Sequence, residues 1–172
     1  MSTSRVSRSA TVAAPPSKVS GLLYGLGFGG FVDGIVLHQI LQWHHMVSNT
    51  DRYPMSTLEG LKDNTLGDGL FHATAWIFTL TGLLVLWRVL SRPNGPWSTR
   101  TFVGLLLMGF GAFNLVEGIV DHHLLKLHHV RQDSDNQLAW DLAFLALGVA
   151  LFAAGWALKK QGDAEMDEAR RT

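Results

Sequence analysis

The sequence predicts an all-α integral membrane protein, a four-helix bundle built from two repeated helical hairpins. Three observations support this prediction. Four long apolar stretches alternate with polar segments. Charged residues make up only 16% of the chain, against roughly 25% in soluble domains. A pattern of acids and histidines in the first apolar stretch recurs in the third.

The four apolar stretches predict membrane spans at about 20–43, 66–90, 101–125 and 138–158. Each is long enough to cross a hydrocarbon core of roughly 30 Å at about 1.5 Å per helical residue. The second and fourth are apolar on every face, whereas a helix of a soluble bundle needs a polar outer face. We therefore expect one membrane domain, 20–159, between a disordered cytoplasmic tail, 1–19, and a second cytoplasmic tail, 160–172.

Basic residues gather on one side of the predicted membrane. The N-terminal tail, the middle loop and the C-terminal end are rich in them: Arg5, Arg8, Lys18, Arg88, Arg92, Arg100, Lys159, Lys160, Arg170 and Arg171. The other two loops hold fewer, mixed with acids. Because basic residues favour the cytoplasmic side, we expect a plasma-membrane protein with both termini cytoplasmic. All eight histidines would then lie in or near the outer half of the membrane.

The composition excludes several classes of protein. Lys plus Arg equals Asp plus Glu, so no net charge indicates a nucleic-acid partner. The chain has no cysteine, which excludes disulfides, thiolate metal sites and c-type haem attachment. The expected partner is the lipid bilayer, and a homo-oligomer or a larger membrane complex stays open.

The first and third spans are similar to one another. The stretch 27–46, GFGGFVDGIVLHQILQWHHM, aligns with 109–130, GFGAFNLVEGIVDHHLLKLHHV, when Asn114 and Leu115 are treated as an insertion. The alignment matches acids and histidines: Asp33 with Glu117, His38 with His122, His44 with His128, and His45 with His129. The second and fourth spans match more loosely, with His72 opposite Asp141. We therefore expect the two hairpins to be related by a pseudo-twofold axis along the membrane normal.

Acids inside apolar spans are the clearest functional signal. A charged side chain in hydrocarbon costs at least about 2.5–3.5 kcal/mol unless it is paired or hydrated. Carboxylate and imidazole are together ligands for Zn, Fe, Mn and Cu(II), so we expect a transition metal ion near the outer face. The candidate ligands are Asp33, His38, His72, Glu117, His122 and Asp141, with His45, His129, Asp68 and Asp121 as further candidates.

Helical spacing divides these candidates into two layers. On a straight α-helix Asp33 and His44 share one face, and His38 lies about 140° around the axis. Along the helix axis Asp33 and His38 lie about 7.5 Å apart, and His38 and His45 about 10 Å. From these separations we expect a middle layer of Asp33, His38, Glu117 and His122, and an outer layer formed by the histidine pairs 44–45 and 128–129.

The pattern VDGIVLHQILQWHHM, followed by GDGLFH, resembles the bacterial and archaeal membrane family catalogued as domain of unknown function 2243. The likeness covers the chain from about Gly21 to Leu158. It implies a four-helix integral membrane protein and adds no particular activity.

Alternative functions stay open beside metal binding. His38 and His122 occupy matching positions on two spans and could ligate one b-type haem from both faces. The acids and histidines could form a proton or ion pathway, or the chain could be an assembly factor of a membrane complex. The Glu-x-x-His signature of di-iron bundles is absent, which lowers the expectation of a di-iron enzyme. The sequence does not decide whether the protein is an enzyme.

Overall fold

The computed structural model describes residues 18–91 and 97–171, and this part of the chain is helical, with no strand. Four helices account for it. α1 (Lys18–Val32) continues as a π-helix, η1 (Asp33–Ile40), and α3 (Thr99–Glu117) continues as a second π-helix, η2 (Gly118–Leu124). The other two are α2 (Leu58–Leu90) and α4 (Gln137–Ala169). The prediction of an all-α protein with four membrane-crossing helices is confirmed, since all four are long and apolar enough to span a bilayer.

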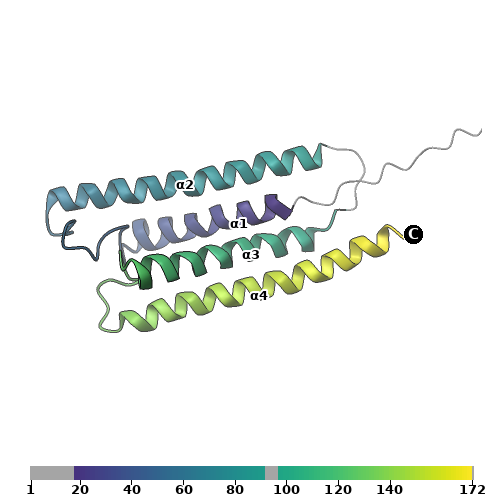
Figure 1. The fold of residues 1–172 in the computed structure, drawn as a ribbon. Coiled ribbons are helices and arrows are strands. Elements are labelled where there is room, and N and C mark those ends of the chain that lie inside the picture. The colour runs from purple at the N-terminus through teal and green to yellow at the C-terminus, as the bar shows by residue number, and fades with distance from the viewer. Residues whose placement is uncertain (1–17, 92–96, 172) are drawn as a thin grey trace, which may run out of the picture.

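The helices lie in a row in the order α2, α1, α3, α4 (Figure 1). α1 packs against α2 and α3, and α3 packs against α1 and α4, while within the described residues α2 and α4 do not touch each other. The chain runs up and down, so the first residue of α1 and the last residue of α4 lie at the same end of the bundle (Figure 1). The loops 41–57 and 125–136 both lie at the opposite end.

The helix ends differ from the ends of the apolar stretches. α2 begins at Leu58, ahead of the apolar span, because the Thr57 hydroxyl accepts a hydrogen bond from the Gly60 amide and caps the helix. α4 continues to Ala169, into the segment expected as a tail, where ion pairs join Arg100 to Glu165 and Lys159 to Asp163. Of the expected N-terminal tail, residues 1–17 lie outside the described residues, as do Arg5, Arg8 and Arg92.

The interior of this bundle is polar and its surface is apolar. Among the large side chains that are wholly buried, Leu105 is accompanied by histidines, asparagines and aspartates. Large apolar side chains instead face outward: Trp76, Ile77 and Trp87 are each more than half exposed. A surface of this kind is stable in lipid, where hydrocarbon covers the outward side chains.

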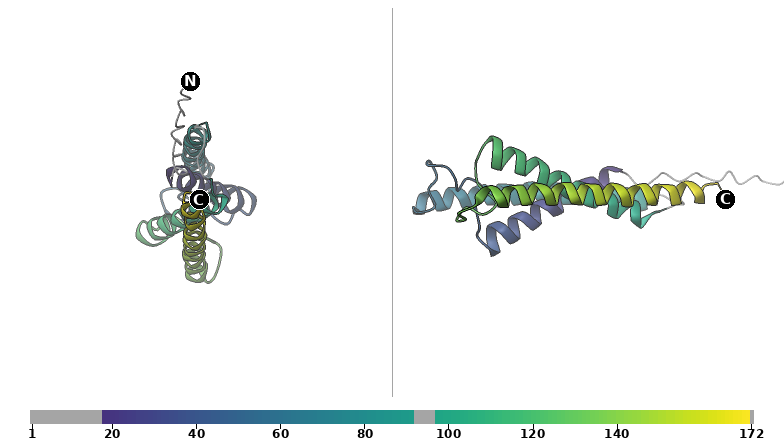
Figure 2. Two further views of the ribbon diagram at one scale, coloured as in Figure 1. Left: turned by 90° about the vertical axis from the view of Figure 1, so that its right-hand side faces the viewer. Right: turned by 90° about the horizontal axis from the view of Figure 1, so that it is seen from below.

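α1 and α3 cross at a contact between two glycines. A Cβ atom built on Gly25 would lie 2.8 Å from the Gly109 Cα and would also meet the main chain of Leu106. Such small residues let backbones approach each other closely in lipid, where no hydrophobic effect drives helix association. Beyond this crossing α1 and α3 diverge toward the loop end (Figure 2), which leaves room there for side chains from the loops.

We expect Gly25→Ala to lower the free energy of unfolding by about 1–3 kcal/mol, the range of an overpacked core. The clash is with backbone, which cannot rotate away. Gly69→Ala is the matched control, because a Cβ atom there meets nothing within 4 Å. Unfolding of both variants in mixed detergent micelles, followed by circular dichroism, measures the difference. Equal stabilities would contradict the close crossing.

Candidate metal centre

The two π-helices bring each acid close to the histidine that follows it by five residues. A π-helix closes i→i+5 hydrogen bonds, so residues five apart lie on nearly the same face. The Asp33 carboxylate is 3.1 Å from the His38 Nε2, and the Glu117 carboxylate is 3.5 Å from the His122 Nε2. All four side chains are buried between α1 and α3.

A sharp turn follows each π-helix and reverses the chain into the bundle. Gln42 and Lys126 adopt positive φ angles, 51° and 52°, and are the only described non-glycine residues to do so. The matching hydrogen bonds run from Leu41 N to Val36 O and from Leu125 N to Val120 O, each 2.8 Å. A left-handed conformation costs a non-glycine residue free energy and persists only where surrounding contacts impose it. Here the turns direct His44 and His128 inward.

His44 and His128 stack at the centre of the cluster. Their ring centroids are 4.4 Å apart with 3° between the planes, and both side chains are wholly buried. Each is held by the other half of the chain. The His44 Nδ1 donates to the Val130 carbonyl at 2.8 Å, and the His128 Nδ1 donates to the Met46 carbonyl at 3.0 Å. This exchange joins the loops 41–57 and 125–136.

Two aspartates on the outer helices hold the remaining histidines. Asp68 on α2 accepts hydrogen bonds from the His38 Nδ1 at 2.9 Å, the His45 Nδ1 at 2.6 Å and the Met46 amide at 2.9 Å. Asp141 on α4 accepts from the His129 Nδ1 at 2.7 Å and the Val130 amide at 2.9 Å, and lies 3.7 Å from the His122 Nδ1. Two of these three hydrogen bonds therefore occur in both halves of the chain, and the third is a longer contact in the second half.

Most of the atoms that point into the cluster are left without partners, although the His128 Nε2 lies 3.3 Å from the Glu117 Oε1. The buried atoms with no hydrogen bond include the Nε2 of His38, His44 and His122, both carboxylate oxygens of Asp33 and the Oε2 of Glu117. Three groups of three side chains bring their donor atoms within 4.8 Å of one another: His38, His44 and His128; Glu117, His122 and His128; and Asp33, His44 and Glu117. These groups share members, so the six side chains form one cluster.

The environment keeps His44 neutral. Burial, and then the neighbouring His128 and His38, lower the pKa of His44 far below its ordinary value. The neutral ring with its Nδ1 proton donated to a carbonyl offers the Nε2 lone pair, which is the form that binds metals.

The structure separates the residues expected from the sequence into three groups. It brings together Asp33, His38, Glu117 and His122 in the cluster. Outside the cluster, Asp68 and Asp141 face its histidines His38 and His122. His45 and His129 in turn donate to these two aspartates. Two lie apart: His72, whose Nδ1 donates to the Asp68 main-chain carbonyl at 2.8 Å, and the half-buried Asp121, whose carbonyl accepts from the Leu127 amide.

The sequence analysis placed His44 and His128 in an outer layer and did not count them among the candidate ligands, whereas the structure puts both at the centre of the cluster. A signal for them existed in the spacing of eleven residues from Asp33 to His44 and from Glu117 to His128. The alignment of the second and fourth spans set His72 opposite Asp141. The hydrogen bonds instead match Asp68 with Asp141, because both accept from the second histidine of a pair and from the amide after it.

The fold and this cluster define a polytopic α-helical membrane protein with a buried histidine–carboxylate centre at one end of the bundle. Residues 20–162 match the model of the family described as "Predicted membrane protein (DUF2243)", and the chain belongs to this family. No curated protein matches the chain, and no solved structure does.

We expect Gln42→Val to be less stable than Gln42→Gly by about 1–3 kcal/mol, because a β-branched residue is strained at positive φ and glycine is not. Gln42 is exposed, so neither variant loses a buried contact. Thermal unfolding in detergent measures the difference. The same pair of substitutions at Lys126 should give the same order, and equal stabilities at both positions would contradict a strained turn.

Proposed function

We propose that the protein binds transition metal in the membrane, through the Nε2 atoms of His38, His44, His122 and His128 and the carboxylates of Asp33 and Glu117. One observation carries the proposal. The inward atoms of these side chains are buried with few partners, while the outer nitrogens of the same rings face carbonyl or carboxylate oxygens. Metal-binding histidines have this arrangement, in which an outer acceptor sets the tautomer and orients the ring.

The number of buried carboxylates supports a site for two metal ions. Asp33, Asp68, Glu117 and Asp141 are all buried, and no lysine or arginine in the described part of the chain is. Uncompensated carboxylates are costly in a medium of low dielectric constant. With the imidazoles neutral, two divalent cations balance four carboxylates. Mixed imidazole and carboxylate ligands suit Zn, Fe, Mn or Cu(II).

The packing of the rings favours metal ions over haem. A haem held by His38 and His122 would need an open slot between those two rings. Instead His44 lies between them, 4.4 Å from His38 and 6.3 Å from His122 by ring centroids, and His128 is stacked on it. Carboxylates beside both Nε2 atoms also fit a cation better than an apolar porphyrin.

The interior of α1 argues against a proton pathway across the membrane. Between Ser20 and Asp33 the buried residues of this helix are glycines, which cannot relay protons. A purely structural role in an assembly would leave the inward atoms unsatisfied, at a cost of about 1–3 kcal/mol for each buried group.

We place the metal centre at the outer face of the plasma membrane. The described basic residues at the opposite end of the bundle include Arg88, Arg100, Lys159 and Lys160, and such residues favour the cytoplasm. Both termini are then cytoplasmic, and the loops 41–57 and 125–136 face outward.

Elemental analysis and an optical spectrum of protein that has never met a nickel column test the metal. We expect about two equivalents of Zn, Fe, Mn or Cu per chain, as the charge balance requires. His44→Ala and His128→Ala should lose most of it, because each removes a ligand. His72→Ala should keep it, as its ring donates to a main-chain carbonyl instead.

Folding of each variant is checked by circular dichroism, so that loss of metal is not loss of structure. Purified protein without metal, which also binds none on addition of each ion, would refute the proposal. A Soret band removed by the His38→Ala and His122→Ala double variant would establish haem in its place.

Cysteine labelling tests the orientation, since the chain has no cysteine of its own. We expect Asp135→Cys to react with a membrane-impermeant maleimide in intact cells, and Ser91→Cys to react only after the cells are opened. Both residues are exposed, at opposite ends of the bundle. The reverse pattern of labelling would place the cluster at the cytoplasmic face.

A further inference from the structure

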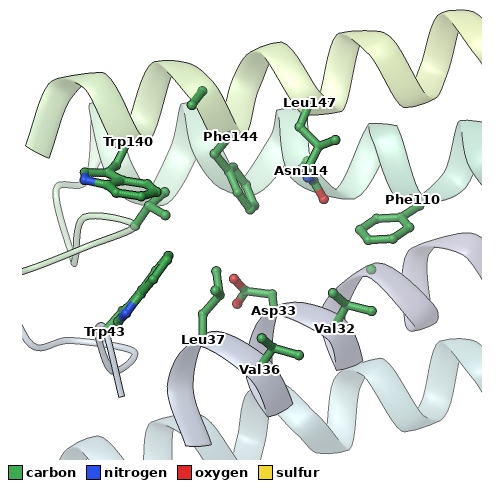
Figure 3. Close-up of a pocket in the computed structure, with 13 residues that line it drawn as sticks. Val32, Asp33, Val36, Leu37, Trp43, Phe110, Asn114, Trp140, Phe144 and Leu147 are labelled. Carbon is green, nitrogen blue, oxygen red and sulfur yellow. The ribbon is translucent and has the colours of Figure 1, made fainter. Parts of the chain in front are cut away.

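An apolar cavity of about 260 Å³ lies beside the cluster, between α1, α3 and α4. Figure 3 shows its walls: Trp43, Trp140, Phe144 and Phe110 surround the space, and the Asp33 carboxylate points into it. The cavity therefore reaches a residue of the proposed metal centre. Its volume is below the roughly 300 Å³ at the lower end of ligand pockets, so it fits one ring and not a larger molecule.

Two buried residues that line this cavity carry acceptor atoms without a hydrogen bond. The Asn114 Oδ1 makes none although the residue is only 1% exposed, and both Asp33 oxygens make none at 3% exposure, with the His38 Nε2 lying 3.1 Å from one of them. An unsatisfied buried acceptor costs free energy that a ligand donor would recover. The cavity thus calls for an apolar ligand with at least one hydroxyl group.

Asn114 does not belong to the framework that the two halves share. It is one of the two residues inserted in the second copy of the repeated pattern, so the first copy has no counterpart. Its side chain points toward the same space as Asp33, from the opposite helix (Figure 3). Asn114 therefore distinguishes this side of the bundle.

The cavity opens to the lipid-facing surface. Val32, Val36 and Leu147 on its rim are 36%, 37% and 50% exposed, on a face that hydrocarbon covers. An aromatic wall closes the end nearest the loops. The Trp43 and Trp140 rings lie 5.1 Å apart, and the Arg131 guanidinium lies over both at 5.3 and 5.6 Å. Flat aromatic walls favour a flat aromatic ligand.

We propose that this cavity binds the ring of a membrane quinol, with its hydroxyl groups donating to the Asp33 carboxylate and the Asn114 Oδ1. The isoprenoid tail leaves between Val36 and Leu147 into the bilayer. The inference rests on the proposed function in one respect: Asp33 serves both sites and places the quinol hydroxyl beside the metal. The observations on the cavity and on Asn114 do not depend on the proposed metal.

The experiment measures binding of a radiolabelled decyl-tailed benzoquinol to the detergent-purified full chain by flow dialysis under reducing conditions. The comparison ligand is the dimethyl ether of the same compound, which has the same ring but no donor. We expect saturable binding, with the quinol bound about tenfold tighter than the ether, the range of one or two hydrogen bonds. Asn114→Leu, which keeps the size and removes the acceptor, should reduce that preference about threefold or more.

A filled cavity should bind neither ligand. Ala143 lines the cavity, so Ala143→Trp should abolish binding. Ala146→Trp is the matched control on the same helix, at an exposed alanine that does not line the cavity, and should bind as the unaltered protein does. If Ala143→Trp fails to fold, the comparison of quinol with ether in the unaltered protein still tests whether the cavity recognises the hydroxyl groups.

Equal affinity for quinol and ether would overturn the proposal and indicate an ordinary lipid chain in the cavity, as would binding that Ala143→Trp leaves intact. Metal content is measured in each sample. Quinol binding by protein that holds no metal, and binds none on addition of each ion, would refute the metal centre and leave the quinol site standing. Protein that holds metal but binds no quinol would refute the quinol site and leave the metal centre standing.

Discussion

The constraint on which this structure depends is the burial of acids and imidazoles inside a bundle whose outer surface faces lipid. Four carboxylates and the rings of His38, His44, His122 and His128 lie at one end of the interior, where no water can solvate them cheaply. Three neighbouring features bring these side chains together. Glycines let α1 and α3 cross closely, the helices diverge beyond the crossing (Figure 2), and the loops return to fill the space. The hydrogen bonds exchanged between His44 and His128 and the opposite loops then tie the two halves together.

The local backbone accepts unusual conformations to achieve this. Both π-helices and both left-handed turns occur at matching places in the two halves, and neither conformation is favoured by its own residues. Conformations of this kind persist where the surrounding contacts over-determine them, and they concentrate at functional sites. The repeated pattern in the sequence and the repeated contacts agree in placing an acid and two histidines from each half around one centre. The relation between the hairpins by a pseudo-twofold axis stays a prediction.

The two halves of the chain differ beside the cluster. Asn114 is present in one half only, and the tryptophans Trp43 and Trp140 line the cavity on the same side of the bundle. The cluster is shared between the halves, while the cavity belongs to one side and opens toward lipid. The other walls of the cluster are formed by the helices and by the loops 41–57 and 125–136, which carry His44 and His128. Site and cavity meet at Asp33, the residue that lines both.

Most of the fold was predictable from the sequence, because the length and apolarity of four stretches determine membrane-spanning helices almost regardless of context. The sequence also determined that Asp33, Glu117, His38 and His122 needed partners, since isolated acids in hydrocarbon are costly. Only the tertiary structure decided how they meet. On an α-helix Asp33 and His38 lie about 140° apart, and only the π-helical turn brings them together. His44 and His128 join them through turns at Gln42 and Lys126, whose positive φ no residue type there foretells. Asp68 and Asp141 became equivalent only through contacts between helices, because the spans that carry them share too little sequence for alignment to match them.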